Sequence, residues 1–106
     1  MIKYNKLVRD NIPQIIKESG KECNIHILSN DQFKIELKKK LVEEANELLH
    51  AKNYEESIEE LADIYEVLET ILIEEKYDLL DIKKKRIQKN MSKGSFEEKI
   101  FLEYVK

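Results

Sequence analysis

Apolar residues recur at helical intervals along residues 31–50. Successive apolar positions are four, four, four and three residues apart, at Phe33, Leu37, Leu41, Ala45 and Leu48. A helix places residues at these intervals on one face. The pattern predicts a helix over residues 31–50, capped at its start by Asn30 or Asp31.

Residues 54–76 carry a wider apolar surface. Two stripes with helical spacing lie side by side, the first at Ile58, Leu61, Tyr65, Leu68 and Leu72, the second at Ile64, Val67 and Ile71. The connection to the preceding helix, residues 50–53, is short, so the two helices are expected to be antiparallel neighbours. We therefore predict a second helix over residues 54–76, and we expect it to be the most buried helix, with neighbours on more than one side.

The beginning of the chain is less regular. A short helix is predicted over residues 14–19, with Pro13 tolerated in its first turn. Its cap is expected to be Asp10 or Asn11, and the helix is expected to stop at Gly20, which readily adopts a left-handed conformation.

The remaining segments complete an all-α chain. Residues 23–28 form either a short strand or an extended arm, a third long helix is predicted over residues 78–91, and the apolar tail 96–105 is expected to dock. A charged fraction of 39% with only two Gly and one Pro favours helices over a turn-rich β fold. We predict a helical bundle in one domain over residues 1–106, with residues 1–29 as an N-terminal arm and residues 30–106 as the helical core.

Charge and cysteine content exclude several classes of protein. The net charge is −3, which argues against a nucleic-acid partner, because neutralising nucleic-acid phosphates requires a basic surface. Cys23 is the only cysteine, so no internal disulfide is possible. No apolar run approaches the roughly 20 residues of a membrane helix, and the start lacks the apolar segment of a signal peptide. A cytoplasmic protein without a membrane partner is expected.

Two pairs of carboxylates border the apolar stripes: Glu44 with Glu47, and Glu60 with Asp63. Residues three apart lie on nearly the same face of a helix. None of the four has a Lys or Arg four residues later, where a solvated helix face would often place one. Carboxylates gathered in this way repel one another unless a cation lies among them, and hard oxygen ligands suit Mg²⁺ or Mn²⁺. We predict a metal site here; the alternative is an acidic, solvated helix face.

Basic residues are concentrated at 83–93. This stretch is either a solvated helix face or a cationic wall that binds the outer phosphates of a nucleotide. In the second case Lys6 and Arg9 are expected to join it, since the Arg side chain suits bidentate phosphate contacts.

Four motifs together carry a family resemblance. They are E-E-x-x-E at residues 43–47, E-x-x-D at 60–63 after a gap of twelve residues, K-L-V-R-D-x-I-P at 6–13, and the stretch 89–96 around Gly94. In this combination the chain resembles the all-α nucleoside triphosphate pyrophosphohydrolases, especially their MazG-like and phosphoribosyl-ATP pyrophosphohydrolase-like branch. Lys93 stands where Arg is common in that family.

The resemblance implies a helical core that binds Mg²⁺, or Mn²⁺ in its place, through Glu44, Glu47, Glu60 and Asp63, with Glu43 as a further candidate. It implies attack of water at the α-phosphorus of a nucleotide, which yields a nucleoside monophosphate and pyrophosphate. Glu44 or Glu47 is the expected general base. The residues expected to contact phosphates are Lys6, Arg9, Lys89, Asn90 and Lys93.

Two other functions stay open at this point. Hydrolysis of phosphoribosyl-ATP in histidine biosynthesis would use the same metal chemistry, whereas a helical interaction module would have no catalytic activity. The resemblance implies a homodimer or homotetramer. Association is also expected on physical grounds, because the helix at 54–76 is too apolar for three short helices to cover completely.

Overall fold

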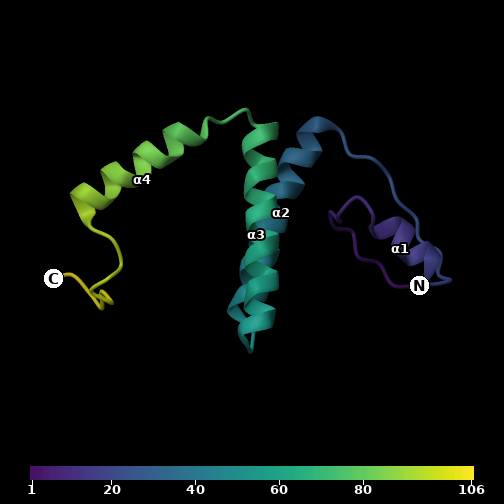
Figure 1. Ribbon diagram of the computed structural model, residues 1–106, viewed down its shortest axis with the longest axis horizontal. Coiled ribbons are helices and arrows are strands. Elements are labelled where there is room, and N and C mark those ends of the chain that lie inside the picture. Colours follow the sequence, from purple (N-terminus) through teal and green to yellow (C-terminus); the bar gives the residue numbers. More distant parts are fainter. The chain divides into compact units, whose positions relative to one another are not determined.

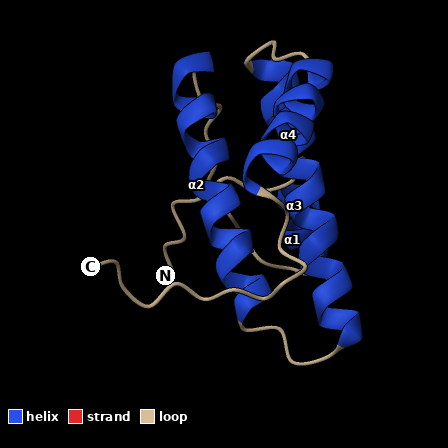
Figure 2. Cartoon of the chain, turned by 90° about the vertical axis from the view of Figure 1, so that its left-hand side faces the viewer, coloured by secondary structure: helices blue, strands red, loops and turns tan.

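The computed structural model describes all 106 residues, and every regular element in it is a helix (Figures 1 and 2). The elements are α1 (Ile12–Glu18), α2 (Asn30–Leu49), α3 (Tyr54–Glu74) and α4 (Leu79–Lys93). The predicted all-α class is confirmed, and each helix boundary lies within two residues of its predicted position. Residues 23–28 have no regular structure, so the strand alternative is wrong. None of the four helices has the combination of length and apolar character that crossing a membrane requires.

The start of α2 corrects one prediction. Ser29 is the cap, and Asn30 and Asp31 lie inside the first turn. The Ser29 hydroxyl accepts a hydrogen bond from the Gln32 N–H at 3.2 Å, and the Gln32 side chain accepts one from the Ser29 N–H at 3.5 Å. This reciprocal capping box satisfies two backbone donors at once, which a cap at Asn30 or Asp31 would not do.

The short helix α1 follows the prediction more closely. Asn11 holds the cap position, although its side chain makes no capping hydrogen bond, and Pro13 lies in the first turn. Gly20, with φ +86°, follows the end of the helix in the left-handed conformation that glycine adopts without steric cost.

The chain divides into two compact units, Met1–Lys76 and Tyr77–Lys106. The first contains α1, α2 and α3, and the second contains α4 and the tail. The single domain predicted over residues 1–106 stays a prediction.

The first unit is organised by an antiparallel pair of helices, α2 and α3, which lie side by side (Figure 1). The stripe of α2 that faces the partner includes Leu37, which is only 3% exposed. From α3, Val67 is buried, and Ile64 and Ile71 beside it are half-buried. Thus the second apolar stripe of α3, the one beside Glu60 and Asp63, is the stripe that packs on α2.

The other stripe of α3 is not covered within its unit. Ile58, Leu61, Tyr65 and Leu68 are all exposed. The expectation that α3 is the most buried helix, with several neighbours, is therefore wrong for this unit, because α2 is the one helix that packs along it. The apolar side chains of the tail, residues 96–105, are not covered by α4 within their own unit.

Leu37→Ala is expected to destabilise the protein by about 2–4 kcal/mol, since it removes a fully packed side chain from the α2–α3 contact. Urea unfolding at a fixed chain concentration measures this. Leu49→Ala, on the same helix at a position that is 77% exposed, is the matched control and should change stability by no more than about 0.5 kcal/mol. Equal losses for both variants would contradict the assigned packing.

Candidate metal centre

Three carboxylates meet where α2 and α3 pack together. Glu44 on α2 and Glu60 and Asp63 on α3 each offer one oxygen, and these three oxygens lie within 4.8 Å of one another. Glu44 and Glu60 stand eight residues before and eight residues after Lys52, in the middle of the connection. Antiparallel helices joined by so short a loop bring such residues level with each other, and Asp63 follows Glu60 on the same face.

The carboxylates lie partly inside the packed contact rather than on a solvated face. Glu44 is only 7% exposed and is the one buried charged residue of the chain. The Oε2 atom of Glu60 is shielded from solvent and has no hydrogen-bond partner. Burying a carboxylate oxygen without a partner is costly, and an unpaired buried polar atom in a native fold requires an explanation.

The crowding changes the acidity of Glu60. A hydrogen bond with the Glu44 side chain, then desolvation, then repulsion from Glu44, Asp63 and Glu47 raise the pKa of Glu60 to about 7. The physical cause is that two carboxylates sharing a hydrogen bond need one proton between them.

Three basic side chains surround the cluster. Arg9 Nη2 donates to Asp63 Oδ1 at 2.7 Å, and Lys6 Nζ donates to Glu43 Oε1 at 3.1 Å. Both come from the irregular segment before α1 (Figure 1). The structure thus brings two of the predicted phosphate-binding residues to the predicted metal ligands.

The third cation is Lys40, which the sequence interpretation missed. Its Nζ lies 3.4 Å from Glu44 Oε1 and 3.4 Å from Glu43 Oε2. Lys40 stands four residues before Glu44 and three before Glu43, so it pairs with both from the preceding turn of α2. Glu44 therefore has a basic helical partner before it, although it has none four residues later.

Glu43 has a different environment from Glu60. Burial acts to raise the pKa of Glu43, but hydrogen bonds and charges from Lys6 and Lys40 outweigh it and hold the pKa below its usual value. Glu43 therefore stays ionised in an ion-pair network and is not one of the three converging ligands.

Glu47, the fourth predicted ligand, is exposed and lies outside the group of three converging oxygens. Its charge still contributes to the raised pKa of Glu60, so it lies near the cluster. It forms no ion pair with a basic side chain.

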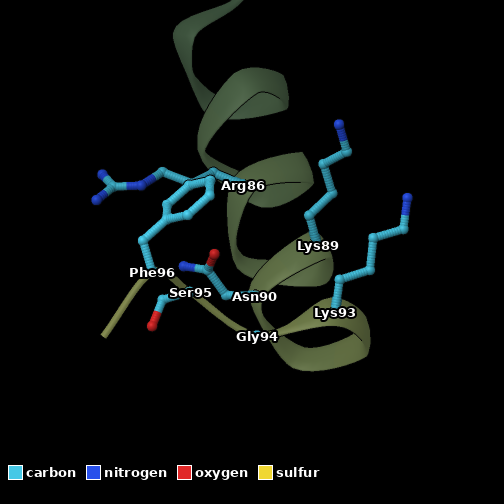
Figure 3. A pocket seen from close by; sticks show the side chains of 7 residues that line it. All are labelled: Arg86, Lys89, Asn90, Lys93, Gly94, Ser95 and Phe96. Carbon is cyan, nitrogen blue, oxygen red and sulfur yellow. The ribbon is translucent and has the colours of Figure 1, made fainter. Parts of the chain in front are cut away.

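The remaining predicted residues lie in the second unit. Lys89, Asn90 and Lys93 line a hollow of about 500 Å³ at the end of α4 (Figure 3), where Gly94 turns the chain with φ +83°. This volume is in the range of small-molecule sites, and cations are favoured at a helix C-terminus by the helix dipole. The other residues that line it are Arg86, Ser95 and Phe96.

Arg86 and Phe96 were not among the predicted contacts. In Figure 3 they extend to one side of the helix end, whereas Lys89 and Lys93 extend to the other. The signal for Arg86 was present, since it stands one helical turn before Lys89 and Asn90 within the basic stretch. Phe96 follows the glycine, and helical periodicity does not extend to that position.

The first unit's cluster fits a divalent cation by its chemistry. Its donors are carboxylate oxygens alone, which is the set that Mg²⁺ and Mn²⁺ prefer, and one of the three side chains, Glu60, has a buried oxygen without a hydrogen-bond partner. A cation among these oxygens would also remove the repulsion that leads Glu60 to retain a proton.

Comparison with family models, curated proteins and solved structures gave no match to the chain. The resemblance to the all-α nucleoside triphosphate pyrophosphohydrolases therefore rests on its sequence motifs and stays a prediction.

Glu60→Gln is expected to change how stability depends on pH in the presence of a chelator. Glu60 titrates near pH 7 when folded and near 4.3 when unfolded, so between these values the folded state binds more protons and the free energy of unfolding falls as pH rises. Glu60→Gln lacks this pH-dependent loss of stability. The difference in the free energy of unfolding, variant minus wild type, should therefore be more positive at pH 8 than at pH 5. Thermal unfolding across this range measures the effect.

Glu59→Gln, at the exposed neighbouring position, controls for the loss of one negative charge from α3. It should keep the wild-type pH dependence, in which Glu44, Lys40, Arg9, Asp63 and Glu47 still surround Glu60. If the stability difference between Glu60→Gln and the wild type is the same at pH 5 and pH 8, Glu60 does not hold the shared proton.

Proposed function

We propose that the protein is a divalent-metal-dependent nucleotide pyrophosphohydrolase, which splits a nucleoside triphosphate into a monophosphate and pyrophosphate. One observation carries the proposal: Glu44, Glu60 and Asp63 converge between two packed helices, and a buried carboxylate oxygen has no partner. The sequence motifs point to the same chemistry. Hydrolysis of a phosphoanhydride needs a concentration of positive charge next to an activated water, and such a carboxylate group is suited to hold the metal.

The metal ligands in this proposal are Glu44, Glu60 and Asp63, with Mg²⁺ as the cation and Mn²⁺ as its substitute. When bound, the metal supplies Lewis-acid polarisation of the phosphate and lowers the pKa of a coordinated water. Glu43 supports the ligands indirectly, because it holds Lys40 and Lys6 at the edge of the cluster.

Glu47 is the better of the two candidates for the general base. Glu44 is buried and ion-paired with Lys40, so its carboxylate is poorly accessible to an attacking water. Glu47 is exposed and unpaired next to the cluster, where an attacking water is accessible and a carboxylate can accept its proton.

In this proposal the phosphates are bound by four basic residues and one asparagine. Lys6 and Arg9 already lie at the cluster, and their side chains are partly exposed, at 42% and 57%. Lys89, Asn90 and Lys93 form a second group of phosphate ligands in the hollow at the end of α4. Positive charge around the transferred group neutralises the charge that develops there.

The protein is also proposed to be a homo-oligomer. The stripe formed by Ile58, Leu61, Tyr65 and Leu68 is a continuous apolar face of α3 and is exposed. A contiguous apolar helix face of this kind commonly marks an interaction surface, and a second copy of the same hairpin offers a matching one.

Glu60→Gln and Asp63→Asn are each expected to reduce metal-dependent pyrophosphate release from a nucleoside triphosphate panel by about 100-fold or more, since even residues that only support a metal ligand cost 10–100-fold. Glu59→Gln, exposed on the same helix, should retain wild-type turnover. Release of pyrophosphate is measured with Mg²⁺ and with a chelator. Full activity in both ligand variants would exclude this metal site, and the absence of turnover by a folded wild type would exclude the function.

Replacing Leu61 and Leu68 together by Gln is expected to convert an oligomeric wild type into a monomer, because both side chains belong to the exposed stripe. Sedimentation velocity at micromolar concentration measures this. Leu49→Gln, exposed on α2, should leave the assembly intact. A wild type that sediments as a monomer would contradict the proposed oligomer.

A further inference from the structure

The N-terminal segment supplies two of the three cations at the carboxylate cluster. Arg9 reaches Asp63 across 54 residues of sequence, at 2.7 Å, and Lys6 reaches Glu43 across 37 residues, at 3.1 Å. Asp63 is one of the three converging carboxylates. The guanidinium of Arg9 therefore provides, from outside the hairpin, part of the positive charge that the cluster requires.

The backbone of Arg9 is anchored, whereas its side chain is accessible. The Arg9 carbonyl accepts a hydrogen bond from the Ile12 N–H at 3.1 Å, at the start of α1. The Arg9 side chain is 57% exposed and that of Asp63 is 36% exposed. Ion pairs this exposed contribute little to stability, so exchanging one partner for another needs only a change of side-chain rotamer.

A divalent cation bound at the cluster would share the Asp63 carboxylate with the Arg9 guanidinium. Both cations are attracted to Asp63, and two positive charges next to the same carboxylate repel each other. The stronger charge of a divalent cation favours its contact with the carboxylate. A guanidinium released from Asp63 remains next to the cluster, where it suits an anion with several oxygen acceptors.

We propose that Arg9 is an exchangeable cation: it pairs with Asp63 in the metal-free chain and, when a divalent cation binds the cluster, turns to the phosphate groups of the substrate. This inference rests on the proposed function and adds an order to it, because the metal must bind before Arg9 becomes available to phosphate. Lys6 keeps its pair with Glu43, which lies outside the three converging ligands.

Calorimetric titration of the full chain with Mn²⁺ alone tests the competition. Arg9→Gln removes the competing charge and is expected to tighten Mn²⁺ binding about fivefold. Arg9→Lys keeps the charge and should stay within about twofold of the wild type. Lys38→Gln is the matched control, since Lys38 is 59% exposed and pairs across the same two helices with Glu75, away from the cluster; it should also stay within about twofold.

Titration with inorganic phosphate tests the second half of the exchange. Phosphate should bind the Mn²⁺-loaded wild type about tenfold more tightly than loaded Arg9→Gln. Without metal, the wild type and Arg9→Gln should bind phosphate equally weakly, because the Arg9 side chain is then paired with Asp63.

The outcomes separate the two levels of the proposal. If Mn²⁺ binds the wild type and Arg9→Gln with equal affinity, or binds the variant more weakly, the exchange is overturned while the metal site stands. Metal-free wild type that binds phosphate as tightly as the loaded form also overturns the exchange. If neither protein binds Mn²⁺, the proposed function fails and the exchange fails with it.

Discussion

The packing of α2 against α3 is the constraint on which the rest of the site depends. The same contact buries Leu37 and Val67 and brings Glu44 to within ligand distance of Glu60 and Asp63. Glu44 borders the apolar stripe of α2 and is buried in the contact with α3. Concentrating negative charge in this contact costs free energy, and each cation described above offsets part of that cost.

The basic side chains of the protein compensate only part of the negative charge of the carboxylate cluster. Lys40 and Lys6 bind Glu43, Lys40 also approaches Glu44, and Arg9 binds Asp63. None of these cations reaches Glu60, whose Oε2 atom has no partner and whose pKa is raised. Long basic side chains approach the cluster from its edges, whereas a small ion can reach the oxygens between the helices. This difference in access favours the proposed metal over a further ion pair as the partner of Glu60.

The sequence predicted what depends on local periodicity and spacing. The apolar stripes at residues 33–48 and 58–72 predicted α2 and α3, and the short connection predicted that the two helices are antiparallel neighbours. The Ser29 cap was missed because adjacent Asn30 and Asp31 are equally good cap residues, and the reciprocal bond with Gln32 decided the outcome. The Arg9–Asp63 and Lys6–Glu43 ion pairs could not be predicted from the sequence, because they depend on the path of an irregular segment that has no periodic pattern.

The exposed stripe of α3 bears on the carboxylates as well as on assembly. Leu61 directly follows Glu60 and is exposed, so the stripe and the cluster share one border along the helix. Covering the stripe would remove water from that border and lower the effective dielectric constant around Glu60 and Asp63. An uncompensated charge there would then cost more, and a cation would be held more strongly. The two proposals are therefore linked: if a second copy covered this stripe, the proposed cation would be bound more tightly than in a single chain.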